Sequence, residues 1–245
     1  VCSDWAHAMR IGIDTTSSGA DVGQSVHGFP LLVRLSADHF PFEEAQPDGA
    51  DLRLVDAAGT VLAHEIERWD TDAKMADIWV LVPYIEGNRR DNLLLMYWGN
   101  PRVPPASSGR SVFGPFACVL HMTGEGDGLT SHVADSSGHD SAGLLQNPDA
   151  AAAPTHGIAG PGLEFDGEDT YLTIATRMTM PAPVTFSLWF RTTSTAGGGL
   201  AGLANKASGD DAQFDRVLWM EEDGRLALAM MTGSGYSLVA GLTGY

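Results

Sequence analysis

The feature that most constrains this fold is the stretch Asp77–Pro101, which reads DIWVLVPYIEGNRRDNLLLMYWGNP. It contains two apolar runs, residues 78–82 and 93–98, which are joined by a polar turn and closed by Gly-Asn-Pro. Both faces of each run are apolar, which is typical of central strands covered on two sides rather than of edge strands. The stretch therefore predicts a β fold with a closed core. It carries no catalytic signature of its own.

Further strand-like runs precede this stretch and make up the rest of the first half. They are His7–Asp14, Phe29–Ser36, Asp51–Asp56 and Val61–Trp69. The last two flank a short turn that contains Ala-Ala-Gly, and this spacing predicts a hairpin. Turn residues recur about every 8–12 positions, as in β-sandwiches, and no helix-periodic segment of useful length occurs before residue 110. We expect an antiparallel β-sandwich over residues 1–104.

A polar, proline-rich segment, RVPPASSGR, predicts a linker over residues 105–112. The runs that follow predict a second antiparallel module, a jelly roll, over residues 113–245. Its expected strands are residues 116–122, 143–146, 170–174, 184–191, 200–206, 216–220, 226–231 and 237–241. The chain stops at Tyr245 directly after a predicted strand, so we expect the carboxyl-terminal strands of this jelly roll to be missing. The unpaired edge would favour self-association.

Charge and composition limit the classes of partner. The formal net charge is −17 with only 14 Lys and Arg residues, which argues against nucleic acid and against an anionic membrane surface. No run of about 18 apolar residues is present, so we expect no transmembrane segment. The opening VCSDWAHAMR lacks the features of a signal peptide and is compatible with one already removed. Cys2 and Cys118 could form one disulfide or remain two thiols.

Several longer motifs carry a resemblance to known families. RIGID, FPLLVRLS, PDGADLRLVD, HEIERWD, DIWVLVP and LLLMYWGNP, within residues 4–101, together resemble the bacterial and archaeal DUF2341 domain. VLHM, ADSSGHDSAGL, GPGLEFDGEDTYLTI and VTFSLWF resemble a laminin-G-like, concanavalin A-type jelly roll over roughly residues 113–245. The two modules in this order are similar to the extracytoplasmic part of some MotA/TolQ/ExbB-class proteins and to secreted surface proteins.

The resemblance implies a non-enzymatic module outside the cytoplasm, either periplasmic or on the cell surface. The channel helices of the MotA/TolQ/ExbB class are absent from this sequence, so channel activity is not carried over.

The acidic run HEIERWD raises the question of catalysis. Glu65 and Glu67 lie on one face of a predicted strand, and paired carboxylates serve glycoside hydrolysis in enzymes of concanavalin-like fold. The central Asp of that enzyme motif is absent, and the run lies in the first module rather than in the jelly roll. We therefore expect no catalytic residues and no enzyme activity, because fold analogy alone does not establish a reaction.

The run ADSSGHDSAGL is the best candidate for a metal site. Asp135 and Asp140 could join Glu164, or else Asp166 or Asp169, around a Ca²⁺ ion, which binds six to eight oxygen ligands. The alternative, which the residues favour, is that Asp135 makes a turn by accepting hydrogen bonds from the following amides. His121 and His132 lack partners at zinc-type spacing.

Three aromatic residues on predicted strands of the second module are candidates for ligand binding. Trp189, Trp219 and Tyr236 could stack on sugar rings if they line one face of a sheet. The alternative is ordinary sandwich core, which the sequence favours for Trp189 over Tyr236.

The sequence thus predicts an all-β chain of two antiparallel sandwich modules. The leading hypothesis is a non-catalytic binding or assembly module of a bacterial cell-envelope protein, which recognises a glycan or a protein. A structural element of an envelope motor or filament and a glycoside hydrolase are the alternatives. No cofactor is expected apart from calcium.

Overall fold

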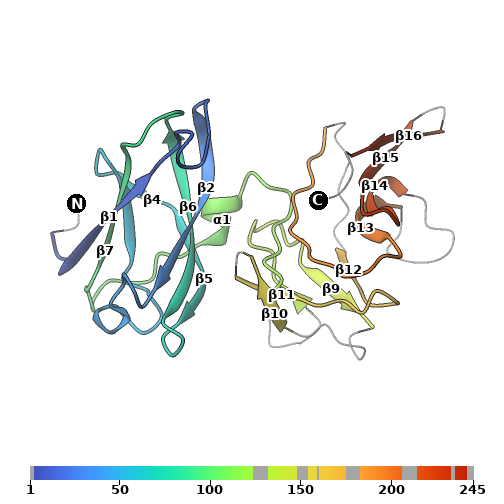
Figure 1. Cartoon of the computed structure of the whole chain (residues 1–245). Coiled ribbons are helices and arrows are strands. Elements are labelled where there is room, and N and C mark those ends of the chain that lie inside the picture. The colour runs from blue at the N-terminus through green and yellow to red at the C-terminus, as the bar shows by residue number, and fades with distance from the viewer. Residues whose placement is uncertain are drawn as a thin grey trace. The chain divides into compact units, whose positions relative to one another are not determined.

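The computed structural model describes residues 3–123, 132–147, 154–158, 160–174, 183–205, 214–232 and 235–241. Contacts group the chain into two compact units, and each is described by itself. The first comprises residues 1–142 and 154–163, and the second comprises residues 143–153 and 164–245. Strands dominate the described parts of both units (Figure 1). The prediction of an all-β chain built from antiparallel sheets is confirmed.

The first unit is a sandwich of two antiparallel sheets. One sheet has the order β1–β7–β3–β4, with β1 His7–Ile13, β7 Asn92–Trp98, β3 Arg53–Asp56 and β4 Val61–Leu62. The other has the order β2–β6–β5, with β2 Val26–Ser36, β6 Met75–Ile85 and β5 His64–Asp70. A short 3₁₀ helix, η1, spans Phe42–Glu44.

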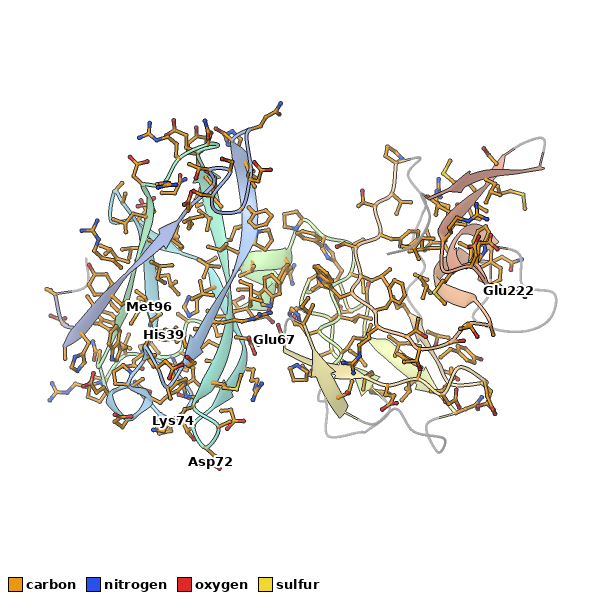
Figure 2. All side chains as sticks on the ribbon, in the orientation of Figure 1. His39, Glu67, Asp72, Lys74, Met96 and Glu222 are labelled. Atoms are coloured by element: carbon orange, nitrogen blue, oxygen red, sulfur yellow. The ribbon has the colours of Figure 1, made fainter. Side chains whose placement is uncertain are left out.

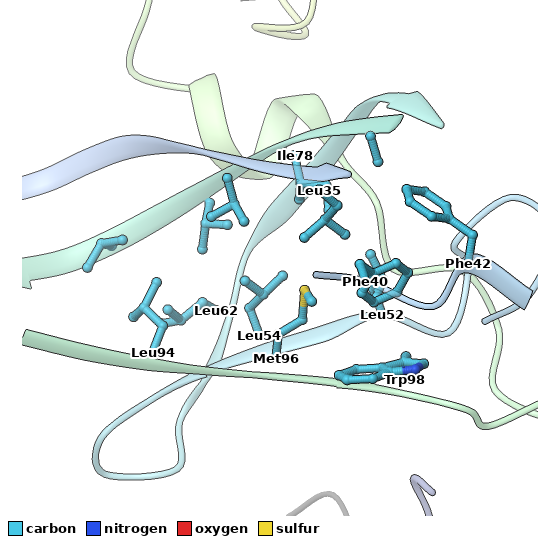
Figure 3. Packing of buried hydrophobic residues seen from close by; sticks show 14 of the residues in the cluster. Leu35, Phe40, Phe42, Leu52, Leu54, Leu62, Ile78, Leu94, Met96 and Trp98 are labelled. Carbon is cyan, nitrogen blue, oxygen red and sulfur yellow. The ribbon is translucent and has the colours of Figure 1, made fainter. Parts of the chain in front are cut away.

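The core of the first unit lies between these two sheets. Ile78 from one sheet and Leu54 and Met96 from the other are fully buried, and their side chains point toward one another (Figure 3). Aromatic rings close one end of this core, where Phe40 packs against Phe42, Trp69 and Trp98. Burying such side chains contributes about 1.5–3 kcal/mol each to folding, which makes the sandwich the stable frame of this unit.

The two apolar runs of residues 77–101 become β6 and β7, and each is a central strand as predicted. They belong to opposite sheets, however, so the polar turn between them crosses the sandwich instead of forming a hairpin. Every second residue of β6, such as Ile78 and Val80, faces the core, and Trp79 faces outward. The outward face is covered as well, by α1, which explains why both faces are apolar.

The predicted hairpin after residue 51 exists, but its second strand is divided. β3 pairs with β4 through Leu54–Leu62 and Val55–Val61. The chain then passes to the other sheet at Ala63, whose carbonyl accepts a hydrogen bond from the Leu81 amide at 2.9 Å. A single strand over residues 61–69 is therefore wrong. Its second part, β5, pairs with β6 in the opposite sheet because Ile66 and Trp69 pack against the core from that side.

The segment predicted as a linker is ordered in the first unit. Ser107 forms a parallel bridge with His64, and Ser108 caps α1, which spans Gly109–Phe113. α1 contacts β5 and β6. The first unit also contains β8, His132–Val133, and a hairpin of β10, Pro154–Gly157, and β11, Gly160–Leu163. The boundary between the two families' modules stays a prediction.

The second unit contains one four-stranded antiparallel sheet and one further strand pair. The sheet has the order β13–β14–β15–β16, with β13 Gly198–Ala204, β14 Phe214–Met220, β15 Leu226–Thr232 and β16 Gly235–Ala240. The further pair is β9, Gly143–Gln146, with β12, Tyr171–Ile174. Each of the six strands overlaps a run that the sequence predicts as a strand.

Two other predicted strands are wrong. Residues 116–122 form no strand, and Leu120 makes only an isolated bridge with Asp135. Residues 184–191 have no regular secondary structure. Side-chain alternation alone does not make a strand, because a strand also needs a neighbouring backbone to bond. Phe186 of this segment lines a hollow of about 280 Å³ together with Leu218 and Leu228.

Candidate functional site

One group of ionisable side chains in the first unit begins on β5. A register shift between Ile66 and Arg68 leaves Glu67 without a partner of its own on β6. Such a bulge redirects the side chains around it. Ile66 packs against the core, and Glu65 and Glu67 project from the other face of the sheet. Figure 2 marks Glu67 on β5, away from the interior residue Met96.

A layer formed by α1 and the residues after it covers this outer face. Within the layer, Phe113 at the end of α1 and His121 pack against Trp79 of β6. The His121 ring stacks on Trp79 with centroids 6.0 Å apart and an interplanar angle of 19°. Phe113 meets both rings edge-on, at 5.6 Å from Trp79 and 5.5 Å from His121. The aromatic rings exclude water from the carboxylates beside them.

His121 lies between the two carboxylates, and we call Glu65, Glu67 and His121 the Glu–His–Glu cluster. Its Nε2 is 3.0 Å from Oε2 of Glu65, and its Nδ1 is 3.3 Å from Oε2 of Glu67. Two neutral donors complete the arrangement. Ser136 Oγ donates to Oε1 of Glu65 at 2.6 Å, and Trp79 Nε1 donates to Oε2 of Glu67 at 2.5 Å.

Two glycines make room for the carboxylates. A Cβ at Gly109 would lie 2.5 Å from Oε1 of Glu65, and a Cβ at Gly160 would lie 2.6 Å from Oε1 of Glu67. Gly160 also has a φ of +112°, which few other residues adopt. Any side chain at either position would push a carboxylate out of place, so the backbone itself closes over the cluster.

Burial and charge shift the pKa values of two members of the cluster. Burial raises the pKa of Glu67, and the charges of Asp77 and Glu65 raise it further, against the opposing His121 charge and the Trp79 hydrogen bond. Burial lowers the pKa of His121, but the Glu65 hydrogen bond and the two carboxylate charges outweigh it, so the net shift is upward. The cluster as a whole therefore binds protons more tightly than its separate side chains would.

The three side chains of the cluster are largely buried and are bonded to one another and to their neighbours. The side chains of Glu65, His121 and Glu67 are only 13%, 12% and 2% exposed. A general acid must lie within hydrogen-bond reach of its substrate, and these carboxylates reach His121, Ser136 and Trp79 instead.

Sequence reasoning singled out all three members of the cluster but did not connect them. Glu65 and Glu67 were considered as an acid pair, and His121 as a histidine without a partner. His121 is 56 positions from Glu65 in the sequence, and no motif links the two runs. Only the packing of the segment after α1 on β5 brings them together.

Asp135, the leading residue of the predicted metal site, is the centre of a loop. Its two oxygens accept hydrogen bonds from the amides of Val119 at 2.9 Å, Ser137 at 2.9 Å and Ser141 at 3.0 Å, and from the Ser137 hydroxyl at 2.7 Å. Burial raises the pKa of Asp135, but these donors outweigh it and lower the pKa overall. The bond to Ser137 is the side-chain turn that the sequence favoured over a calcium site.

The structure does not bring the other predicted metal ligands into a cation site. Asp140 has a left-handed φ of 55° in the same loop as Asp135, whereas Glu164 is exposed and belongs to the second unit. Within the described ranges, no group of three or more His, Cys, Asp or Glu residues is arranged to hold a metal ion. Calcium binding by Asp135, Asp140 and Glu164 stays a prediction.

The three aromatic candidates differ in their surroundings. Trp189 is 77% exposed and follows residues that line the hollow on the second unit, so the expectation of a core position does not fit it. Trp219 on β14 is partly buried, and its Nε1 donates to Oε1 of Glu221 at 2.9 Å. Tyr236 lies opposite Met231 in β16, and its side chain is outside the described part of the structure.

Cys118 carries a free thiol whose Sγ donates to the Ser141 carbonyl at 3.4 Å. Burial raises the pKa of this thiol to about 11, with a further contribution from the charge of Asp135. The structure thus gives Cys118 as a thiol and not as half of a disulfide, and Cys2 lies outside the described residues. At neutral pH the Cys118 thiol is protonated and unreactive.

Comparison with known proteins supports part of the resemblance. Residues 48–117 match the family described as "Domain of unknown function (DUF2341)". The match begins before β3 and includes β5, β6, β7 and α1, and therefore Glu65, Glu67 and Trp79. The predicted resemblance to the DUF2341 domain is therefore confirmed over residues 48–117. No curated protein matches the chain.

Among solved structures, the chain is similar to an S-layer domain-containing protein from Clostridium thermocellum. The identity is 18%, the TM-score is 0.42, and the similarity covers 52% of this chain and 58% of that one. A likeness of this extent is too weak to transfer a fold or a function. No helix in the described parts of the chain is long and apolar enough to cross a membrane.

Proposed function

We propose that this chain is a non-catalytic binding or assembly module of a bacterial cell-envelope protein, and that it works outside the cytoplasm. The resemblance of the first half to the DUF2341 domain and of the second to a laminin-G-like jelly roll supports this setting. The acidic net charge of −17 suits a soluble, exposed surface and disfavours nucleic acid as the partner.

The observation that carries the proposal is the exposed aromatic stretch Val184–Phe190 on the second unit. Trp189 is the most exposed large apolar side chain described, and Val184, Leu188 and Phe190 are each more than a third exposed. Several exposed large apolar side chains within one short segment favour a ligand or partner site there. A flat indole is suited to stacking on a sugar ring and equally to burial in a protein interface.

Replacing Trp189 should abolish most of the binding. We expect Trp189→Ala to weaken binding by at least about tenfold, because buried tryptophans dominate interface energies. Tyr171→Ala, which removes another exposed aromatic ring of the second unit, is the matched control and should bind as the wild type does. A glycan array and stoichiometric co-purification with envelope proteins distinguish the two ligand classes. Equal binding by Trp189→Ala and wild type would remove this surface from the proposal.

The two glutamates of β5 should have no catalytic role. We expect the wild-type chain to hydrolyse no polysaccharide, and Glu65→Gln and Glu67→Gln to bind ligand as the wild type does, because both carboxylates are enclosed by His121 and its neighbours. Reducing-sugar release from cell-wall and storage polysaccharides is the measurement. Turnover that is lost in either variant would favour the glycoside hydrolase alternative instead.

A further inference from the structure

The contacts of His121 carry an inference about how the first unit responds to pH. Both ring nitrogens of His121 face carboxylate oxygens, at 3.0 Å and 3.3 Å. A neutral imidazole has one N–H donor and one lone pair, whereas an imidazolium has two donors. While both carboxylates are ionised, only the charged form of His121 can therefore donate to Glu65 and Glu67 together. In the neutral form a lone pair would face one of the two carboxylates.

The residues joined to His121 form a cover, which we define as residues 114–122 and 135–141. Its two parts are tied together by the amide of Val119, which donates to Asp135, and by the amide of Ser136, which donates to the Val119 carbonyl at 2.9 Å. The cover reaches β5 through His121 and through the Ser136 hydroxyl on Glu65. Both polar contacts depend on the carboxylates of the Glu–His–Glu cluster.

We propose that Glu65, Glu67 and His121 form a proton-operated latch, which holds the cover on the outer face of the β2–β6–β5 sheet while His121 is charged and loosens it when His121 loses its proton. This goes beyond the proposed binding function and does not depend on it. The latch belongs wholly to the first unit.

The charged groups around the latch set the direction of the response. β5 supplies Glu65 and Glu67, and β6 supplies Asp77, whose Oδ1 is 3.5 Å from Nε of Arg34 on β2. Arg34 also donates to the carbonyl of Ile158, beside Gly160. α1 adds the uncharged Phe113 and also Arg110, whose side chain lies against Gly138 of the cover. The cover itself adds Ser136, and its Asp135 and His139 both bond to the Ser137 hydroxyl. Arg34 is engaged with Asp77, and among the contacts of the described residues His121 reaches both glutamates.

The sign of the pH dependence follows from these surroundings. The pKa of His121 is raised in the closed cover, so its contribution is complete below the ordinary value of 6.5 and is lost as pH rises through the raised value. The pKa of Glu67 is also raised, which likewise favours the closed cover at lower pH. Each unit by which the His121 midpoint exceeds 6.5 makes the closed cover about tenfold more favoured at low pH than at high pH.

The test uses the whole chain and two measurements. NMR follows the ring signals of His121 against pH, and hydrogen exchange follows the amides of residues 114–122 from pH 6 to pH 9. Glu67→Gln removes one charge of the latch and leaves a side-chain oxygen for the Trp79 N–H. His27→Gln changes an exposed histidine of the same unit, which contacts Tyr84, and is the matched control. Comparing proteins at the same pH cancels the intrinsic pH dependence of exchange.

We expect His121 to titrate above 6.5 in the wild type and at a lower pH in Glu67→Gln. Exchange in the cover, relative to Glu67→Gln at the same pH, should rise between pH 6 and pH 9, about tenfold for each pH unit by which the wild-type His121 midpoint exceeds that of the variant. His27→Gln should behave as the wild type does. A His121 midpoint at or below 6.5, or an exchange ratio that does not change with pH, would overturn the latch. The wild-type titration decides the matter even if the variant does not fold.

Discussion

Replacing Asp51 by alanine should remove about 3–5 kcal/mol from the free energy of unfolding of the first unit. The Asp51 side chain is only 1% exposed. It accepts backbone hydrogen bonds from Gln46 at 2.9 Å, Gly99 at 2.6 Å and Asn100 at 3.0 Å. Alanine would leave all three amides without this acceptor, and each unsatisfied buried donor costs about 1–3 kcal/mol.

The position of Asp51 explains why so large an effect is expected. Its carboxylate joins the loop before β3 to the Gly-Asn-Pro turn after β7, and its backbone carbonyl accepts from Nε1 of Trp5 at 2.6 Å. Three segments far apart in the sequence thus meet at one residue, two through its carboxylate and one through its backbone carbonyl. Folded domains have only about 5–15 kcal/mol of net stability, so loss of this junction should leave the sandwich marginal.

The measurement is denaturant-dependent hydrogen exchange at amides of β6 and β7, which reports on the first unit alone. Asp48→Ala is the matched control, because the exposed Asp48 accepts only the Ala50 amide and its loss should cost about 1 kcal/mol or less. A loss of under about 1 kcal/mol in Asp51→Ala would show that water or other groups satisfy these amides instead.

The strands of the first unit could be predicted from the sequence because the side-chain alternation that identifies a strand lies within a few neighbouring residues. Alternation at Ile78, Val80 and Val82 identifies a strand whichever sheet that strand joins. The assignment of strands to sheets is not local, since β6 and β7 are neighbours in sequence but lie in opposite sheets. The break at Ala63 follows from the same cause, because β5 finds its partner in β6 and not in β3.

The candidate site could be predicted only in part, for a related reason. Glu65, Glu67 and His121 were each noticed because of their residue types. Their meeting depends on a bulge at Glu67, on two glycines that leave room for carboxylates, and on a segment that alternates like a strand but packs as a loop. None of these features has a sequence signature without the fold. The turn at Asp135 could be predicted from the sequence, because a side-chain turn needs only one residue and the amides that follow it.

Acidification should destabilise the first unit through His64, with an expected loss of about 3 kcal/mol between pH 7 and pH 4. His64 is 2% exposed, and burial together with the charge of Arg53 lowers its pKa to about 4, against an opposing hydrogen bond to Leu62. In the unfolded chain His64 takes up a proton near pH 6.5, whereas in the folded chain it stays neutral until the pH reaches about 4. The free energy of unfolding therefore falls as pH falls from 6.5 to about 4. A shift from 6.5 to about 4 corresponds to about 3 kcal/mol, at 1.36 kcal/mol for each pH unit.

The comparison of wild type with His64→Gln isolates this contribution. The variant should be less stable at pH 7, because it loses the packing of the imidazole, but its deficit should shrink by about 3 kcal/mol as pH falls to 4. His27→Gln, which changes an exposed ring, should follow the wild type throughout. The carboxylates with lowered pKa values, such as Asp135, are common to all three proteins, so their contributions to the pH dependence of stability cancel in the comparison. His64 thus affects stability below pH 6.5, whereas His121 affects it above that value. A stability deficit of His64→Gln that stayed constant from pH 7 to pH 4 would contradict the buried, neutral state of His64.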